Sequence, residues 1–184
     1  AMIDEGAFEK VIEVNFIGAW RSVRACLPQI IERRGHVLIT ASIYSYCNGM
    51  ANAPYAASKA ALEMFGRSLR AELAGTGATA GVLYPGWVST PLSKVGFGGD
   101  EIVTQMLKRA FPRPYNKAVE PERVAAAVVR GMQARAARIA APKRWTPVHW
   151  LRGIVGPLSD AMLDRDTEMH SLMRTLERRD RNGS

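Results

Sequence analysis

Residues 36–86 decide the fold, and they read HVLITASIYSYCNGMANAPYAASKAALEMFGRSLRAELAGTGATAGVLYPG. The stretch contains one short apolar run at 36–42 and another at 78–84, and each has the length of a buried strand. Between the two runs, apolar residues recur three and four positions apart, which predicts a helix over 54–73. The glycines of the GTG triplet that follows end this helix. The stretch therefore predicts a strand, a helix and a second strand.

The same alternation continues on both sides of this stretch. A helical pattern covers 4–34, and another covers 120–133 before a last short strand at 137–142. Such alternation is typical of an α/β fold with a Rossmann-like doubly wound parallel sheet, joined by right-handed crossovers. Between these elements, 92–118 mixes Gly and Pro with one amphipathic stretch near 101–111, which predicts a mobile lid.

We divide the chain into a catalytic Rossmann-like part, 1–142, and a helical C-terminal extension, 143–184. The extension is basic and amphipathic, and it predicts two helices followed by a frayed end, RRDRNGS. Trp145 and Trp150 lie among arginines, a composition that also suits a membrane surface. We favour packing of the extension on its own chain or on a second subunit over membrane contact.

Composition excludes several classes of protein. The formal net charge is +8, yet no zinc-ligand spacing or RNA-binding motif accompanies it, so we expect no nucleic-acid partner. Cys26 and Cys47 form no CxxC pair, and no apolar run is long enough to span a bilayer. The acidic N-terminus also lacks the pattern of a signal peptide, and we therefore expect a cytoplasmic protein.

The three histidines give no metal signal. They are scattered at His36, His149 and His170, without the spacing of a zinc site. We therefore predict no bound metal.

The strongest chemical signal is the segment Tyr55-Ala-Ala-Ser-Lys59. Residues four apart on a helix share a face, so the phenol and the ammonium are expected to lie together. A cation a few ångströms from a phenol favours the phenolate and lowers the phenol pKa toward the range useful for proton transfer. As a bare pattern, however, Y-x-x-x-K also occurs on many helices whose lysine faces solvent.

Two polar residues upstream strengthen the signal. Ser42 lies at the C-terminal end of the first predicted strand, the edge where open α/β sheets bind ligands. Asn15 interrupts the apolar pattern of the first helix, where a buried amide needs a hydrogen-bond partner. Taken singly, Ser42 could bond its own turn and Asn15 could bridge two helices.

Four segments in this order resemble the marks of the short-chain dehydrogenase/reductase family. They are VNFIG at 14–18, TAS at 40–42, YAASKAAL at 55–62 and YPGWVST at 84–90. The resemblance extends over about residues 4–142, and the last forty residues match less clearly. It implies an NAD(P)-dependent oxidoreductase that interconverts a carbonyl and a secondary alcohol.

The resemblance also implies roles for individual residues. Tyr55 would be the general acid/base, and Lys59 would lower its pKa and hydrogen-bond the nicotinamide ribose. Ser42 would donate a hydrogen bond to the substrate oxygen, and Asn15 would hold a water in a proton relay behind Lys59.

For the cofactor, the family pattern points to the segment after the second predicted strand. Pro85 and Gly86 would shape the turn, while the Val88 backbone and the Thr90 hydroxyl would meet the nicotinamide carboxamide. Together with Tyr55 and Lys59, these residues are the expected cofactor contacts.

For the substrate, the resemblance points to large side chains near Ser42. Tyr44 and Tyr46 follow Ser42 closely, and Trp87 follows the Pro-Gly turn. Apolar surroundings suggest an apolar carbonyl compound or secondary alcohol, although the same side chains could simply pack a loop.

The Gly-rich turn that receives the pyrophosphate in this family is missing from the sequence. No G-x-G-x-x-G occurs, and GFGGD at 96–100 follows no predicted strand, so we interpret it as a loop. We therefore expect a longer parent protein in which the absent segment decides between NAD and NADP. The alternative is a non-catalytic fragment or scaffold that cannot bind cofactor. By the same resemblance we expect a homodimer or homotetramer.

Overall fold

The computed structural model describes residues 4–91, 93 and 100–182. In chain order its elements are α1 (Glu5–Ile12), the π-helical η1 (Glu13–Ile17), α2 (Gly18–Glu32), β1 (His36–Thr40), the 3-10 turn η2 (Ile43–Ser45), α3 (Ala53–Glu72), β2 (Thr79–Pro85), α5 (Glu101–Ala110), α6 (Pro121–Gln133), β3 (Arg138–Ala141), the 3-10 turn η3 (Lys143–Trp145), α7 (Thr146–Trp150), α8 (Arg152–Leu163) and α9 (Thr167–Asn182). The lid predicted over 92–118 and the loop predicted over 96–100 lie partly outside the described residues. The amphipathic stretch within that lid forms α5.

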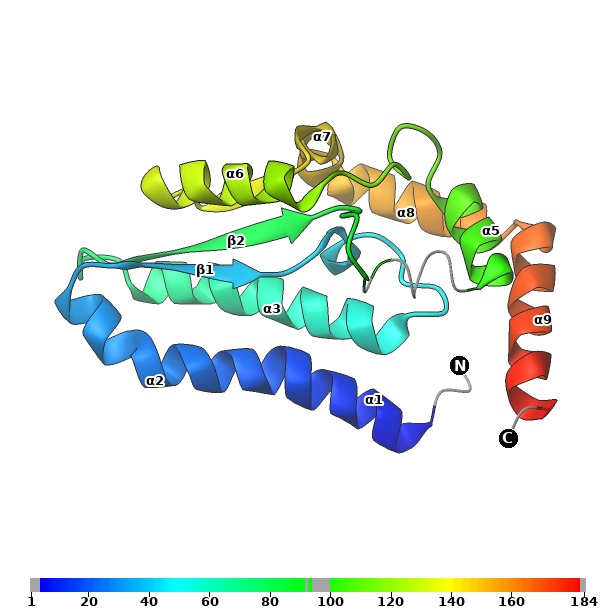
Figure 1. The fold of residues 1–184 in the computed structure, drawn as a ribbon, viewed down its shortest axis with the longest axis horizontal. Coiled ribbons are helices and arrows are strands. Elements are labelled where there is room, and N and C mark those ends of the chain that lie inside the picture. Colours follow the sequence, from blue (N-terminus) through cyan, green and yellow to red (C-terminus); the bar gives the residue numbers. More distant parts are fainter. Residues whose placement is uncertain (1–3, 92, 94–99, 183–184) are drawn as a thin grey trace.

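The three strands form one parallel sheet in the order β1-β2-β3, and Figure 1 shows β1 and β2 side by side. The register places Val37 of β1 opposite Ala80 of β2, and Leu83 of β2 opposite Ile139 of β3. The carboxyl ends of all three strands therefore meet at one edge of the sheet. Among the described residues β1 pairs with β2 alone, so its other side is an open sheet edge. The predicted α/β fold with a parallel sheet is confirmed.

Helices cover both faces of this sheet. A Cβ added to Gly66 of α3 would lie 2.7 Å from Val82 Cγ2, which shows how closely α3 approaches β2. A Cβ added to Gly131 of α6 would lie 2.7 Å from Ile139 Cγ1. Ile139 pairs with Leu83, the neighbour of Val82, and successive side chains of a strand point to opposite faces. The helices α3 and α6 therefore pack on opposite faces, as Figure 1 shows.

The two crossovers have opposite hands. The strand order advances in one direction from β1 to β3, yet α3 and α6 lie on opposite faces of the sheet. A connection that advances in the same direction on the other face has the opposite hand. The prediction that the crossovers are right-handed is therefore wrong for one of the two. The long segment between β2 and α6 gives the chain room to reach the second face.

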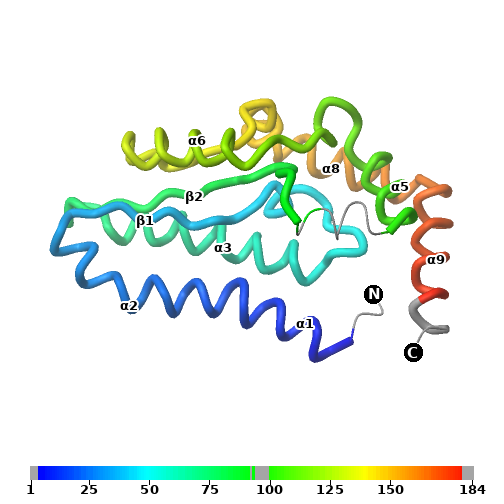
Figure 2. The backbone as a smooth tube through the Cα atoms, in the orientation of Figure 1, coloured from blue at the N-terminus to red at the C-terminus, as the bar shows by residue number. Residues whose placement is uncertain are grey.

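The N-terminal helical pattern forms one continuous helical rod with a π-helical segment inside it (Figure 2). Asp4 caps the rod, since its carboxylate accepts the Ala7 N–H at 2.9 Å. The segment Glu13–Ile17 then adopts wider π turns around Asn15. Beyond it, Val23 and Leu27 of α2 pack against the buried core. Periodicity alone predicted the rod but not its π-helical segment.

The C-terminal extension is folded onto the rest of the chain. Trp145 and Met169 are each only 1% exposed. The extension contains α7, α8 and α9 rather than the two helices that we predicted, because Leu151 interrupts the first helical stretch between α7 and α8. The last helix also continues to Asn182, where the sequence predicted a frayed end.

Several features are absent from the described part of the chain. No helix within residues 4–91 or 100–182 is both long and apolar enough to cross a bilayer. The same residues contain no group of three or more His, Cys, Asp or Glu side chains placed to hold a metal ion. Cys26 is exposed, Cys47 is half-buried, and both are free thiols.

A buried histidine joins the extension to the sheet. His149 of α7 is 5% exposed, and its ring centroid lies 4.4 Å from that of Tyr84 and 5.3 Å from that of Tyr46. Its Nδ1 atom is buried without a hydrogen-bond partner among the described residues. Burial, followed by the charge of Arg152, lowers the pKa of His149 below its usual value of 6.5. The imidazole is therefore neutral in the folded chain.

This histidine predicts that stability falls on mild acidification. Below about pH 6.5 the unfolded chain binds a proton that buried His149 resists, so the free energy of unfolding decreases as the pH falls. The slope cannot exceed about 1.4 kcal/mol per pH unit for one such group. Denaturant unfolding at a series of pH values measures it. The variant His149→Phe should show a shallower slope, and an unchanged slope would contradict this assignment.

Candidate active site

Tyr55 and Lys59 share one face of α3, as their spacing predicted. Lys59 Nζ lies 5.4 Å from the centroid of the Tyr55 ring and donates a hydrogen bond to the Thr40 carbonyl at 3.1 Å. Within the sheet, the Ala41 N–H points to β2 and donates to the Leu83 carbonyl. Backbone groups of successive strand residues point in opposite directions, so the Thr40 N–H and carbonyl point to the open edge of β1. The ammonium is thus placed where β1 ends.

Ser42 reaches the same place from the end of β1. It is 5% exposed and begins the turn η2, in which its Oγ accepts the Tyr44 N–H at 3.2 Å. Its side chain also forms a hydrogen bond with the side chain of Tyr55. The structure therefore brings together three of the predicted site residues, Ser42, Tyr55 and Lys59.

Burial decides the pKa of both titratable groups. It raises the pKa of the Tyr55 phenol above its usual value of 10.0, and the hydrogen bond with Ser42 opposes this only in part. Burial likewise lowers the pKa of Lys59. The Lys59 ammonium lies over the ring face and is bound to the Thr40 carbonyl, and its lowering of the Tyr55 pKa stays a prediction. Tyr55 is a protonated phenol at neutral pH.

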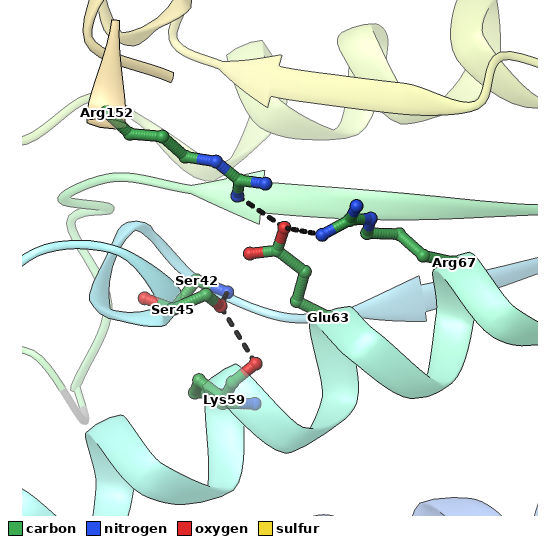
Figure 3. Close-up of polar contacts among 6 residues, drawn as sticks. All are labelled: Ser42, Ser45, Lys59, Glu63, Arg67 and Arg152. Atoms are coloured by element: carbon green, nitrogen blue, oxygen red, sulfur yellow. Dashed lines mark hydrogen bonds and ion pairs between the residues drawn. The ribbon is translucent and has the colours of Figure 1, made fainter. Parts of the chain in front are cut away.

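Ser45 connects the two segments that carry the site (Figure 3). Its Oγ donates to the Lys59 carbonyl at 2.8 Å and accepts the backbone N–H of Ser42 at 3.4 Å. The loop that holds Ser42 is thereby fixed to the helix that holds Lys59. Ser45 was not predicted as a site residue, although a serine three residues after another is a weak form of the capping-box pattern.

Glu63 anchors the C-terminal extension to the same helix. It lies one turn beyond Lys59, is 4% exposed, and pairs with Arg152 of α8 and with Arg67 at 3.5 Å (Figure 3). A buried carboxylate requires such partners. No sequence pattern predicts the pair of Glu63 and Arg152, because 89 residues separate them.

Asn15 contacts α3 directly. Its Nδ2 donates to Ser58 Oγ at 3.1 Å, and Ser58 Oγ donates to the Tyr55 carbonyl at 2.7 Å. Ser58 is completely buried. The π-helical segment therefore presents the Asn15 amide to the turn of α3 between Tyr55 and Lys59. The proposed water relay behind Lys59 remains a prediction.

The Pro-Gly turn follows β2 as predicted and lies against the C-terminal extension. Pro85 ends β2, and the Gly86 N–H donates to the Ala141 carbonyl at 2.8 Å. A Cβ added to Gly86 would lie 2.7 Å from Cδ1 of the buried Trp145 indole. Only glycine therefore fits at this position without displacing Trp145.

The segment after this turn forms a short parallel bridge with Val119. The Val119 N–H donates to the Trp87 carbonyl at 2.9 Å, and the Ser89 N–H donates to the Val119 carbonyl at 2.8 Å. Both bonds are made by the residues on either side of Val88. The Val88 N–H and carbonyl therefore point away from Val119. The Thr90 hydroxyl accepts the Ser93 N–H at 3.2 Å and keeps its own proton for another acceptor.

The aromatic residues predicted to line the substrate site separate into two groups. Tyr44 packs edge-on against Tyr55, with ring centroids 5.8 Å apart, and against Trp87 at 5.7 Å. Tyr46 instead packs against Tyr84 and the buried His149, and its hydroxyl is buried. Tyr44 and Trp87 therefore border Tyr55, whereas the Tyr46 ring packs under the extension, and contact between Tyr46 and the substrate stays a prediction.

Comparison with known proteins identifies sequence relatives. A profile of the short chain dehydrogenase family matches residues 1–97. The 1-deoxy-11-beta-hydroxypentalenate dehydrogenase of Streptomyces exfoliatus is 41% identical over 102 residues, which cover 52% of this chain and 37% of that protein. Dehydrogenase/reductase SDR family member 7B of Rattus norvegicus is 38% identical over 85 residues, which cover 46% of this chain and 26% of that protein.

Solved structures share the fold. A variant of actinorhodin polyketide ketoreductase, solved with NADPH, matches with a TM-score of 0.63 and 29% identity, over 76% of this chain and 58% of that chain. A 4-hydroxyisoleucine dehydrogenase complexed with NADH gives a TM-score of 0.63 at 20% identity over 74% of this chain, a likeness of fold alone.

The chain matches only part of each of these longer proteins. The chain spans less than two fifths of the two curated relatives and a little over half of the solved chains. The family profile, in contrast, matches more than half of this chain and includes the segments with Asn15, Ser42, Tyr55, Lys59 and Gly86. The chain belongs to the short-chain dehydrogenase family.

Proposed function

We propose that the protein is an NAD(P)-dependent oxidoreductase that interconverts a carbonyl and a secondary alcohol, with Tyr55 as general acid/base. One observation carries the proposal: the Ser42 side chain is hydrogen-bonded to Tyr55, and Lys59 Nζ lies over the Tyr55 ring at the carboxyl end of β1. A hydroxyl donor, a phenol and a cation at this edge suit proton transfer to a carbonyl oxygen.

Each side chain then has a distinct task in reduction. Ser42 donates a hydrogen bond to the substrate oxygen, and Tyr55 gives that oxygen its phenolic proton. Burial raises the pKa of Tyr55, so the phenol holds this proton at neutral pH. Lys59 supplies positive charge beside the phenolate that remains. In oxidation, Tyr55 accepts the alcohol proton instead.

The residues after β2 suit a nicotinamide. The Val88 N–H and carbonyl, which point away from Val119, offer a donor and an acceptor to a carboxamide. The Thr90 hydroxyl adds a donor, and Lys59 can meet the ribose hydroxyls. The turn at Pro85 and Gly86 lets the backbone approach closely. When bound, the nicotinamide supplies or accepts the hydride. These contacts are common to NAD and NADP.

The substrate is proposed to be apolar. The Tyr55 ring is bordered by Tyr44, which in turn contacts Trp87 and Phe111 through edge-on ring packing. Aromatic walls with few charges favour a hydrophobic ketone or secondary alcohol.

A cofactor-oxidation assay of the full-length protein tests the proposal. Purified protein is mixed with NADH or NADPH and a panel of aliphatic, alicyclic and aromatic ketones, and cofactor absorbance is followed with time. We expect ketone-dependent oxidation of at least one cofactor. Cofactor binding in calorimetry without any turnover across the panel, in either direction, would instead indicate a non-catalytic scaffold.

A further inference from the structure

A groove lined by three arginines lies between α3 and the start of β3. Arg67 and Arg70 come from α3, and Arg138 is the first residue of β3. The groove has a volume of about 410 Å³, which falls within the range of small-molecule sites. Its described lining shares no residue with the proposed active site, which lies where β1 ends rather than where the strands begin.

The groove carries positive charge that nearby carboxylates do not balance. None of its described lining residues is acidic. Arg67 pairs with Glu63 at 3.5 Å, but Glu63 also pairs with Arg152, so two guanidinium groups share one carboxylate, as Figure 3 shows. Within residues 4–91 and 100–182, Arg70 and Arg138 form no ion pair at all. The groove therefore has an excess of cations.

Two histidines near the groove are affected by this charge. Burial is the main cause of the lowered pKa of both His36 and His149. The charge of Arg70 lowers the pKa of His36 further, and the charges of Arg138 and Arg67 do the same for His149. The positive potential that opposes a proton on these rings attracts an anion.

Contacts within the chain hold two of the guanidinium groups in place. Arg70 donates to the Ala80 carbonyl of β2 at 2.5 Å. Arg138 lies over the Trp150 ring, with its Cζ 5.7 Å from the ring centroid. A guanidinium group has five N–H donors, so both arginines keep donors for a ligand. Because these side chains are already held, less freedom is lost when they bind an anion.

The arrangement of the arginines indicates what kind of anion fits. Paired N–H donors of a guanidinium group match the oxygens of a phosphate or a carboxylate. A single carboxylate satisfies only one such group, whereas three arginines from two elements suit an anion with several charged groups in a row. We propose that this groove binds a multiply charged phosphate, a di- or triphosphate group that is either inorganic or part of a nucleotide.

Calorimetric titration of the full-length protein with inorganic tripolyphosphate tests the inference. Excess NADPH is present to keep the probe out of the proposed cofactor site. We expect one binding site whose Kd rises about tenfold or more in Arg138→Gln, because hydrogen bonds between charged groups are lost. The matched control is Arg130→Gln, which removes the same charge from an exposed position of α6 outside the described lining. Its Kd should change less than about twofold.

A second variant approaches the groove in the opposite way. Ser68 lines the groove and is exposed, so Ser68→Glu adds a carboxylate there without disturbing the core, and tripolyphosphate binding should be lost. Ser171→Glu, at an exposed position of α9, is its control. Arg67 and Arg70 are left intact, because the first pairs with buried Glu63 and the second holds the backbone of β2.

Two further probes identify the ligand class. ATP that binds more tightly than tripolyphosphate supports a nucleotide ligand, and equal affinities support recognition of the phosphates alone. The inference is overturned if tripolyphosphate does not bind, if Arg138→Gln and Arg130→Gln give equal Kd values, or if hexaglutamate binds in place of tripolyphosphate. Every readout is an affinity, so the result does not depend on whether the proposed oxidoreductase function holds.

Discussion

Tyr55→Phe in the full-length protein is expected to lower kcat by a factor of about 10²–10⁴, the usual contribution of a general acid/base. The variant lacks the phenolic proton that Tyr55 would transfer to a carbonyl oxygen, while the ring and its contacts with Tyr44 and Lys59 remain. Ketone reduction measured under saturating cofactor gives kcat, and calorimetry gives cofactor affinity. Affinity should change little, because the contacts proposed for the nicotinamide carboxamide lie in the segment after β2.

Tyr115→Phe is the matched control for this experiment. Tyr115 loses the same hydroxyl, but its ring packs on Trp145, with centroids 5.1 Å apart, and we assign it no part in proton transfer. Its kcat should stay close to that of the parent protein. If Tyr55→Phe and Tyr115→Phe retain equal turnover, proton transfer by Tyr55 is excluded and the mechanism must be abandoned.

Gly86→Ala is expected to destabilise the protein by about 1–3 kcal/mol or more, the range for forcing extra atoms into a packed interior. The new methyl group would lie 2.7 Å from Trp145 Cδ1 and 3.2 Å from Cε2. The indole cannot move aside easily, because Phe111 and Tyr115 pack against it and it is 1% exposed. Denaturant unfolding of the variant and the parent protein measures the difference.

Two further variants identify the cause of this loss. Gly153→Ala is the control, because no atom lies within 4 Å of the added Cβ in α8 and alanine favours a helix by up to about 1 kcal/mol. In the double variant Gly86→Ala/Trp145→Phe, the smaller ring makes room for the methyl group. The two changes should therefore cost less together than the sum of their separate costs. Strict additivity would show that contact with Trp145 is not the reason.

Local patterns were sufficient to predict much of the fold. Each of the strands and the longer helices in the first 142 residues arises where apolar periodicity placed it, because burial of an apolar face is a local property of the sequence. The position of Tyr55 and Lys59 on one face of α3 follows in the same way from helical geometry. Ser42 was predicted to lie at the ligand-binding edge of the sheet because it follows a strand, and the family resemblance placed it with Tyr55 and Lys59.

The failures concern contacts between distant parts of the chain. The sequence cannot show that Tyr46 packs under the extension, because its partner His149 lies far along the chain and only the tertiary fold brings them together. The position of the Lys59 ammonium could not be predicted in full for a related reason. The spacing of Tyr55 and Lys59 predicted that the ammonium lies near the phenol. The hydrogen bond to the Thr40 carbonyl determines where the ammonium points, and burial shifts the Tyr55 pKa.

The open edge of β1 has a consequence for work with this polypeptide. An unpaired strand edge is a template for another strand, and in solution the readiest source is the same edge of a second molecule. Preparations of residues 1–184 alone should therefore form larger particles as concentration rises, a tendency that light scattering would reveal. A lysine substitution at Thr40, the exposed residue of this strand, would place charge beside the edge and should suppress it.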